Sequence, residues 1–260
     1  MAFRFGPGPI LDSFPGAQAA YSLRKLSSAY TGPILTVRRS SDNATTNIGL
    51  YRYTIDTDAI LSFVGNGNGF VTTWYDQSGN GVNLVQGNTA LQFNIVTSGS
   101  LHYEGNEVVM NAATDRVFTR NTSAVTLNDW TIYVKSKMTG LYGHYVGHPA
   151  SATGFMQHFQ QGLCYYFGGY NNLAGGSGAG YSTDYRKIQA KRNATSTNVR
   201  GYQNGVNLGN SNINTSLDIS TNSHIFGNFA GGGYSGTIRE CIIYPVEHSD
   251  FTISQINNMS

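Results

Sequence analysis

Short segments rich in β-branched and aromatic residues recur along the whole chain, and glycine, asparagine, aspartate or serine bounds each of them. Such residues suit a half-buried pleated surface, and the 32 glycines supply the positive φ that tight turns need. The pattern predicts an all-β fold, a two-sheet antiparallel β-sandwich of the jelly-roll type with a few short surface helices. The clearest strand segments are residues 34–40, 49–55, 70–77 and 129–138.

Local signals predict the other elements. The Asn204-Gly205 pair between apolar residues predicts a two-residue hairpin turn. Ser249 predicts the N-cap of a closing helix over 249–259, and helical spacing of apolar residues predicts a short helix over 17–30. Residues 1–16 contain three prolines and three glycines, which predicts an N-terminal arm or linker. We therefore divide the chain into this arm and a single sandwich domain over 17–260.

The charge balance argues against strongly charged partners. Sixteen Lys and Arg against fourteen Asp and Glu give a net charge of +2, too little to steer the protein toward nucleic acid or an anionic membrane. No run approaches the ~18 apolar residues of a membrane span, and the first residues lack a signal-peptide pattern. We expect no nucleic-acid or membrane partner, and synthesis in a cytoplasm. The distant Cys164 and Cys241 leave open whether they are paired.

Residues 19–49, 63–86 and 234–245 together resemble a concanavalin A-like (laminin-G-like) domain found in bacteriophage structural and tail proteins. The YDQSGNG segment (75–81) is also similar to the catalytic domain of family 54 α-L-arabinofuranosidases. The resemblance covers most of the chain from residue 17 to residue 260. It implies the sandwich fold and contact with carbohydrate.

The resemblance does not carry catalysis with it. The arabinofuranosidase pattern has a Gly-Asp-Asn stretch shortly before the last strand, in which the Asp is the acid/base. The comparable stretch here reads Gly227-Asn228-Phe229, and an amide cannot donate a proton to a leaving oxygen. The adjacent cysteine pair of the pattern has no counterpart either. We therefore predict that the chain is not an enzyme.

If the chain is an enzyme, Asp76 and Glu240 are the candidate catalytic residues, with Glu104 and Glu107 as further carboxylates. A glycosidase needs two carboxyl groups facing each other across the scissile bond, roughly 5 to 9.5 Å apart. Asp76 binds a sugar or a cation in one interpretation. In the other, which we favour, it accepts hydrogen bonds in the glycine-rich turn that follows.

Two interpretations are also open for Glu240. If Ile238, Glu240 and Ile242 share one face of the last strand, burial among apolar neighbours would raise the pKa of Glu240, as a catalytic acid requires. Alternatively, the carboxylate pairs with an arginine such as Arg38 or Arg39. We favour the pairing, because buried charges are usually paired.

Exposed aromatic and amide side chains are the candidates for carbohydrate contact. Aromatic rings stack on the C–H faces of sugars, while amides bond their hydroxyls. The glycine-rich tract 168–181 lacks the features of a phosphate loop, and the nearest histidines lack the spacing of a zinc site, so we expect no cofactor and no metal. The carbohydrate-binding candidates are Tyr170, Asn171, Asn172, Tyr181, Asp76, Gln77 and Asn80.

These observations together predict a phage virion structural protein, a capsid decoration or tail component whose lectin-like domain contacts host surface glycans. Its expected partners are other virion proteins and further copies of itself, and its expected location is the virion after synthesis in the host cytoplasm. The alternatives are a glycoside hydrolase of the α-L-arabinofuranosidase type and a capsid cement protein without a ligand.

Overall fold

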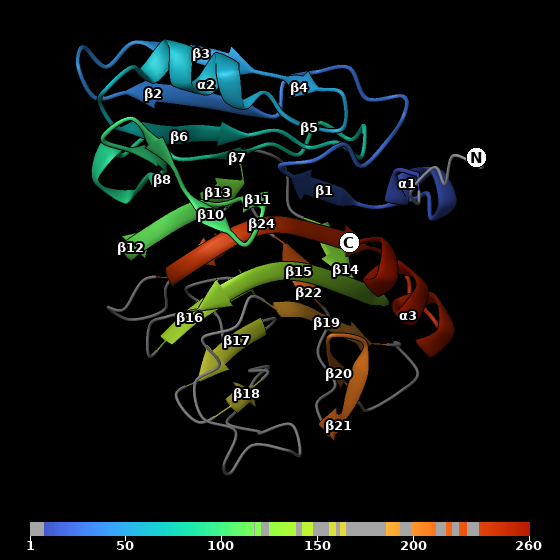
Figure 1. The fold of residues 1–260 in the computed structure, drawn as a ribbon. Helices are drawn as coiled ribbons and strands as arrows, with labels where there is room; N and C mark the ends of the chain where they lie inside the picture. Colours follow the sequence, from blue (N-terminus) through green and yellow to red (C-terminus); the bar gives the residue numbers. More distant parts are fainter. Residues whose placement is uncertain are drawn as a thin grey trace.

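The computed structural model describes residues 8–116, 118–120, 125–138, 142–147, 156–159, 162–164, 186–192, 199–211, 217–219, 224–227 and 234–260. Side chains are described for residues 8–112, 118–119, 125–137, 199–207 and 234–260. The chain forms antiparallel sheets with few short helices, which confirms the predicted β-sandwich class (Figure 1).

One layer is built around β2 and β6, drawn in blue and teal at the top of Figure 1. Strand β2 lies between β3 and β6. Beyond β6 the layer has two branches. One contains β8 and then β9, and the other contains β7, β13, β23, β16, β17 and β18 in that order. The strands of this layer are β2 (Leu35–Arg39), β3 (Thr45–Ile48), β6 (Gly69–Trp74), β7 (Leu84–Val85), β8 (Phe93–Thr97), β9 (Ser100–Leu101), β13 (Phe118–Arg120), β16 (Tyr142–Gly147), β17 (Met156–Phe159), β18 (Gly162–Cys164) and β23 (His224–Gly227).

The other layer is built around the long last strand β24. Strands β1 and β12 pair with β24 on one side, and β15, β19, β20 and β21 follow on the other. The two layers join where Asn94 of β8 pairs with Asn111 of β12. The strands of this layer are β1 (Ala19–Ser22), β12 (Met110–Arg116), β15 (Trp130–Met138), β19 (Arg186–Arg192), β20 (Val199–Gln203), β21 (Val206–Ser211) and β24 (Tyr234–Tyr244).

Three two-stranded sheets and four short helices complete the described part of the chain. Two of these sheets are hairpins, β4 (Leu50–Tyr51) with β5 (Thr54–Ile55) and β10 (Tyr103–Glu104) with β11 (Glu107–Val108). The third pairs two strands that are distant in sequence, β14 (Val125–Leu127) and β22 (Leu217–Ile219). The helices are α1 (Ile10–Ser13), α2 (Thr57–Val64), the 3-10 helix η1 (Thr89–Leu91) and α3 (Asp250–Met259). None of the described helices has the length and hydrophobicity to cross a membrane.

The main core lies between the two layers. Val37, Val71 and Trp74 of the first layer pack in one buried cluster with Ile132 and Ile243 of the second. A smaller cluster lies on the other face of β24, where α1 and α3 cover Tyr133, Ile242 and Tyr244. Ile10 and Leu11 belong to this smaller cluster, so residues 10–14 of the expected arm pack against the sandwich.

Local chemistry predicted two of these elements well. Asn204 and Gly205 both have positive φ and join β20 to β21, and Ser249 caps α3 by accepting a hydrogen bond from the Thr252 N–H at 3.1 Å. The helix predicted over 17–30 is wrong. Residues 19–22 form β1, all of whose side chains are buried, because β24 pairs with this segment and both of its faces are covered. Tertiary pairing has overridden the helical spacing.

A β-bulge at Arg239 interrupts β24. Lys135 of β15 pairs with Glu240 while the next residue, Ser136, pairs with Ile238, so Arg239 is the extra residue. Ile238 lies in the main core, whereas Ile242 lies in the smaller cluster on the opposite face. The two isoleucines therefore do not share a face, and the regular alternation assumed from the sequence fails at this point.

Candidate functional site

Asp76 holds the turn that follows β6 and fastens it to β1. Its carboxylate accepts hydrogen bonds from Ala20 N at 2.8 Å, Ser78 N at 2.9 Å, Ser78 Oγ at 2.7 Å and Val82 N at 3.1 Å. The side chain is buried, with 4% exposed. All four hydrogen bonds are therefore formed within the protein, and both carboxylate oxygens are used by them. The geometry is that of the turn acceptor considered from the sequence, extended by one bond to a residue 56 positions away.

The next polar residues of the same motif bind the neighbouring segment. The Gln77 side chain accepts a hydrogen bond from Leu26 N at 2.8 Å and donates to the Ser22 and Arg24 carbonyls. Asn80 Nδ2 donates to the carbonyls of residues 17 and 18 at 3.0 and 3.1 Å. The YDQSGNG motif thus fixes residues 17–26. Asp76 and Gln77 are buried, and sugar contact by these two residues and by Asn80 stays a prediction.

Glu240 is buried and ion-paired. Its carboxylate lies 2.8 Å from Arg24 Nε and 3.1 Å from the terminal guanidinium nitrogen, and it accepts a hydrogen bond from Ser22 Oγ at 2.8 Å. Burial alone would raise the pKa of Glu240, but Arg24, Ser22 and the nearby Lys135 together lower it. The predicted arginine pairing is present, with Arg24 as the partner. The two arginines considered from the sequence are engaged elsewhere, Arg38 with Gln92 and Arg39 with Asp42.

The β10–β11 hairpin brings two more carboxylates onto the same face of the sheet. Glu107 lies 2.8 Å from Lys135 Nζ and 3.1 Å from Arg239. Glu104, its cross-strand neighbour, lies 3.3 Å from Lys137 Nζ and accepts a hydrogen bond from Thr237. The bulge allows Arg239 and Glu240, which are consecutive, both to reach this polar face. The hairpin is thereby fastened to β15 and β24 by ion pairs.

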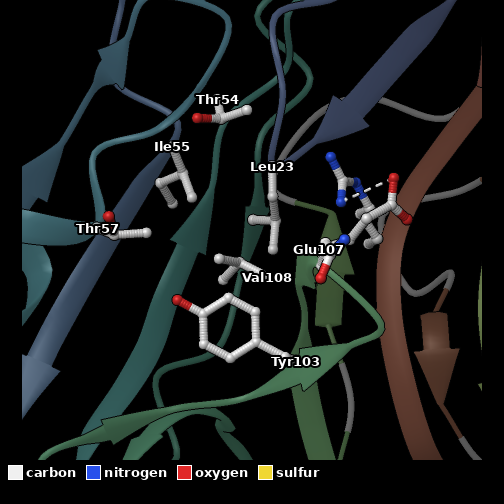
Figure 2. Close-up of a pocket in the computed structure, with 9 residues that line it drawn as sticks. Leu23, Thr54, Ile55, Thr57, Tyr103, Glu107 and Val108 are labelled. Carbon is white, nitrogen blue, oxygen red and sulfur yellow. Dashed lines mark ion pairs between the residues drawn. The ribbon is translucent and has the colours of Figure 1, made fainter.

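A cavity of about 420 Å³ opens beside this hairpin (Figure 2). Its walls come from four parts of the chain: the segment after β1, the start of α2 with β5, the β10–β11 hairpin and the bulge of β24. Nothing in the sequence marked these residues as a group. The lining residues are Leu23, Thr54, Ile55, Thr57, Tyr103, Asn106, Glu107, Val108 and Arg239.

Four of the predicted carbohydrate-binding residues belong to a part of the chain that the structure does not describe. Tyr170, Asn171, Asn172 and Tyr181 lie outside the described residues, as does Asn228. Carbohydrate contact by these residues stays a prediction. The backbone of Cys164 is described in β18, and Cys241 is a buried free thiol in β24. Within the described residues, no group of three potential ligands among His, Cys, Asp and Glu is placed to hold a metal ion.

Comparison with known proteins identifies the family. The model of the family described as "Alpha-L-arabinofuranosidase B, catalytic" matches residues 13–201, well over half of the chain. The chain belongs to the α-L-arabinofuranosidase B catalytic family. A probable α-L-arabinofuranosidase B of Aspergillus terreus is 41% identical over 85 residues, and the Aspergillus oryzae enzyme is 40% identical over 85 residues. Each match covers 31% of this chain and 17% of the relative.

Solved structures of arabinofuranosidases share the fold of this family member. A mutant GH54 α-L-arabinofuranosidase soaked with 4-nitrophenyl α-L-arabinofuranoside superposes with a TM-score of 0.69 at 18% identity. An arabinofuranosidase in complex with arabinofuranosyl-α-1,2-xylobiose gives a TM-score of 0.64 at 19% identity. Both comparisons cover 98% of this chain and 65% of the other, so the chain spans less than two thirds of these proteins.

The family assignment corrects the functional prediction. The expected phage virion protein, its virion location and the prediction that the chain is not an enzyme are wrong, because the family model and the curated relatives are arabinofuranosidases. The glycoside hydrolase, which stood as an alternative, agrees with these findings. The misleading signal was the generic sandwich pattern, which many functions share.

Proposed function

We propose that this family member hydrolyses terminal α-L-arabinofuranosyl bonds. The observation that supports the proposal is the family match over residues 13–201, which includes the segments fixed by Asp76 and Gln77. Gln77 donates a hydrogen bond to the Arg24 carbonyl, and the Arg24 guanidinium pairs with Glu240, so we assign the YDQSGNG motif a scaffold role in the enzyme.

The reacting carboxyl pair lies elsewhere in this proposal. A general acid must carry a proton to the leaving oxygen, and its partner must reach the sugar from the other side. Four carboxylates already form hydrogen bonds or ion pairs with other residues of the protein, namely those of Asp76, Glu104, Glu107 and Glu240. We therefore look for the pair first among the acidic residues whose side chains lie outside the described ones, which are Asp115, Asp184 and Asp218.

Turnover of an aryl glycoside tests the proposed activity. The purified chain is expected to release 4-nitrophenol from 4-nitrophenyl α-L-arabinofuranoside, measured by absorbance, and not from the matching β-D-xylopyranoside. Single Asp→Asn variants at the three positions above then identify the reacting residues. Absence of release at high protein concentration, with the fold intact by circular dichroism, would contradict the proposal.

Asn228 allows a second test, because the family pattern has an acid/base Asp in the comparable stretch. Nitrophenolate leaves without needing a proton, whereas a sugar hydroxyl must be protonated as it departs. We expect Asn228→Asp to raise turnover of arabinofuranosyl-xylobiose by about tenfold or more, with a smaller effect on the aryl glycoside. Sugar release is followed by chromatography. Equal effects on the two substrates would show that residue 228 does not supply the proton.

A further inference from the structure

The cavity beside the β10–β11 hairpin has the features of a built binding site. Its volume of about 420 Å³ lies within the roughly 300–1,000 Å³ that small-molecule sites occupy. Leu23 and Ile55 form an apolar wall and are each 1% exposed, so this wall is rigidly packed into the main core. Figure 2 shows the side chains of Leu23, Ile55, Val108 and Tyr103 gathered around one space, with Glu107 at its side.

An exposed aromatic ring forms another wall of the cavity. The Tyr103 side chain is 53% exposed although it lines the cavity and belongs to a short hairpin. The hairpin is held in place by the ion pairs of Glu104 and Glu107, so the ring has a fixed support. A half-exposed tyrosine on a fixed hairpin offers a flat apolar face and a polar edge to a ligand.

The polar side of the cavity is preorganised as well. Arg239 is only 6% exposed, its terminal nitrogen lies 3.1 Å from Glu107, and its Nε has no hydrogen-bond partner among the described residues. Glu107 retains 34% side-chain exposure. Asn106 and Thr54 add an exposed amide and an exposed hydroxyl. The cavity is thus lined by both donors and acceptors beside an apolar wall, and the Glu107 carboxylate lies between the charges of Arg239 and Lys135.

We propose that this cavity is a carbohydrate-binding site that holds one neutral sugar residue against the Tyr103 ring. Sugar hydroxyls both donate and accept, which matches the mixture of Arg239, Glu107 and Asn106. The C–H face of the sugar matches the aromatic ring and the apolar wall. A negatively charged ligand fits less well, because the Glu107 carboxylate lines the cavity and would face it. Sugar binding here does not depend on the proposed hydrolysis.

Isothermal titration with xylobiose tests the site, since xylobiose carries no arabinofuranosyl bond that the chain could cleave. We expect saturable binding that Tyr103→Ala weakens about tenfold, the loss of one stacking contact. Tyr103→Phe keeps the ring and is expected to bind within about threefold of the parent, which separates stacking from hairpin folding. Tyr51→Ala is the matched control, because Tyr51 is 62% exposed and is not a lining residue.

Two results would overturn the proposal: no saturable binding of xylobiose at millimolar sugar, or equal weakening by Tyr51→Ala and Tyr103→Ala. The outcome is independent of the activity assay. Tyr103-dependent binding without turnover would support this site and contradict the proposed hydrolysis. Turnover without Tyr103-dependent binding would do the reverse.

Discussion

Asp76→Asn is expected to lower the free energy of unfolding by about 2 to 5 kcal/mol. The carboxylate accepts four hydrogen bonds, two on each oxygen. An amide nitrogen cannot accept, so whichever oxygen is replaced at least one buried backbone N–H loses its partner: that of Ala20 on one oxygen, or that of Val82 on the other. An unsatisfied buried donor costs roughly 1–3 kcal/mol, and the bond from Ala20 that joins the turn to β1 is at risk.

Urea denaturation followed by tryptophan fluorescence measures this loss, because Trp74 lies in the main core two residues before Asp76. Asp58→Asn is the matched control, since Asp58 is exposed in the first turn of α2 and its change is expected to stay within about 1 kcal/mol. The result also separates two roles. If Asp76→Asn kept its stability and lost turnover, Asp76 would be a catalytic residue and the scaffold interpretation would be wrong.

Glu240→Gln is expected to destabilise the chain by about 3 to 5 kcal/mol at neutral pH, the usual cost of breaking a buried ion pair by removing one partner. The change leaves the Arg24 guanidinium, only 17% exposed, beside a neutral amide. It also removes a negative charge near Lys135. A loss of turnover in this variant therefore shows a catalytic role for Glu240 only if the variant is still folded under the assay conditions.

The stabilisation by the Glu240–Arg24 pair is expected to decrease at acidic pH. The pKa of Glu240 is lower in the folded chain than its ordinary value of 4.5, so the unfolded chain binds the proton more readily. The stabilisation by the pair is full above about pH 4.5 and is lost as the pH falls through the folded-state pKa. The difference in unfolding free energy between the parent and Glu240→Gln should therefore shrink as the pH falls from 5 toward 3.

Asp42→Asn provides the control for Glu240→Gln, because Asp42 forms an ion pair with Arg39 in which the carboxylate is 49% exposed. Surface pairs contribute little, so this variant should change stability far less. A double variant, Arg24→Met with Glu240→Gln, should lose less than the sum of its single variants, since no buried charge is left unpaired. A stability difference that grew on acidification would show that the assigned pairing is wrong.

Part of the fold follows from local chemistry in the sequence. The Asn204-Gly205 turn and the Ser249 cap depend on residues within a few positions of each other, and both were predicted at the right place. The turn role of Asp76 is local in the same sense, because Ser78 and Val82 follow within six residues. Such local interactions can be predicted from the sequence because the interacting atoms are close in the chain whatever the rest of the fold is.

The errors arise where distant segments meet. Residues 19–22 have the spacing of a helix and form a strand because β24 pairs with them from more than 200 positions away. The sequence indicated that Glu240 pairs with an arginine, but Arg24 could be identified only once β1 and β24 lay side by side. The adjacent charges of Arg239 and Glu240, which stand between the apolar residues Ile238 and Cys241, are the one signal of the bulge that could have been used.

The sequence by itself determined the antiparallel sandwich class, the tight turns and the capped closing helix, because side-chain periodicity and turn chemistry act over a few residues. Only the tertiary structure decided which charges are neighbours, which face of β24 carries Glu240, and that four separate segments enclose a cavity with Tyr103 and Arg239 in its walls. Those properties depend on strand pairing over long sequence separations, which is set by how the whole core packs and by no single segment.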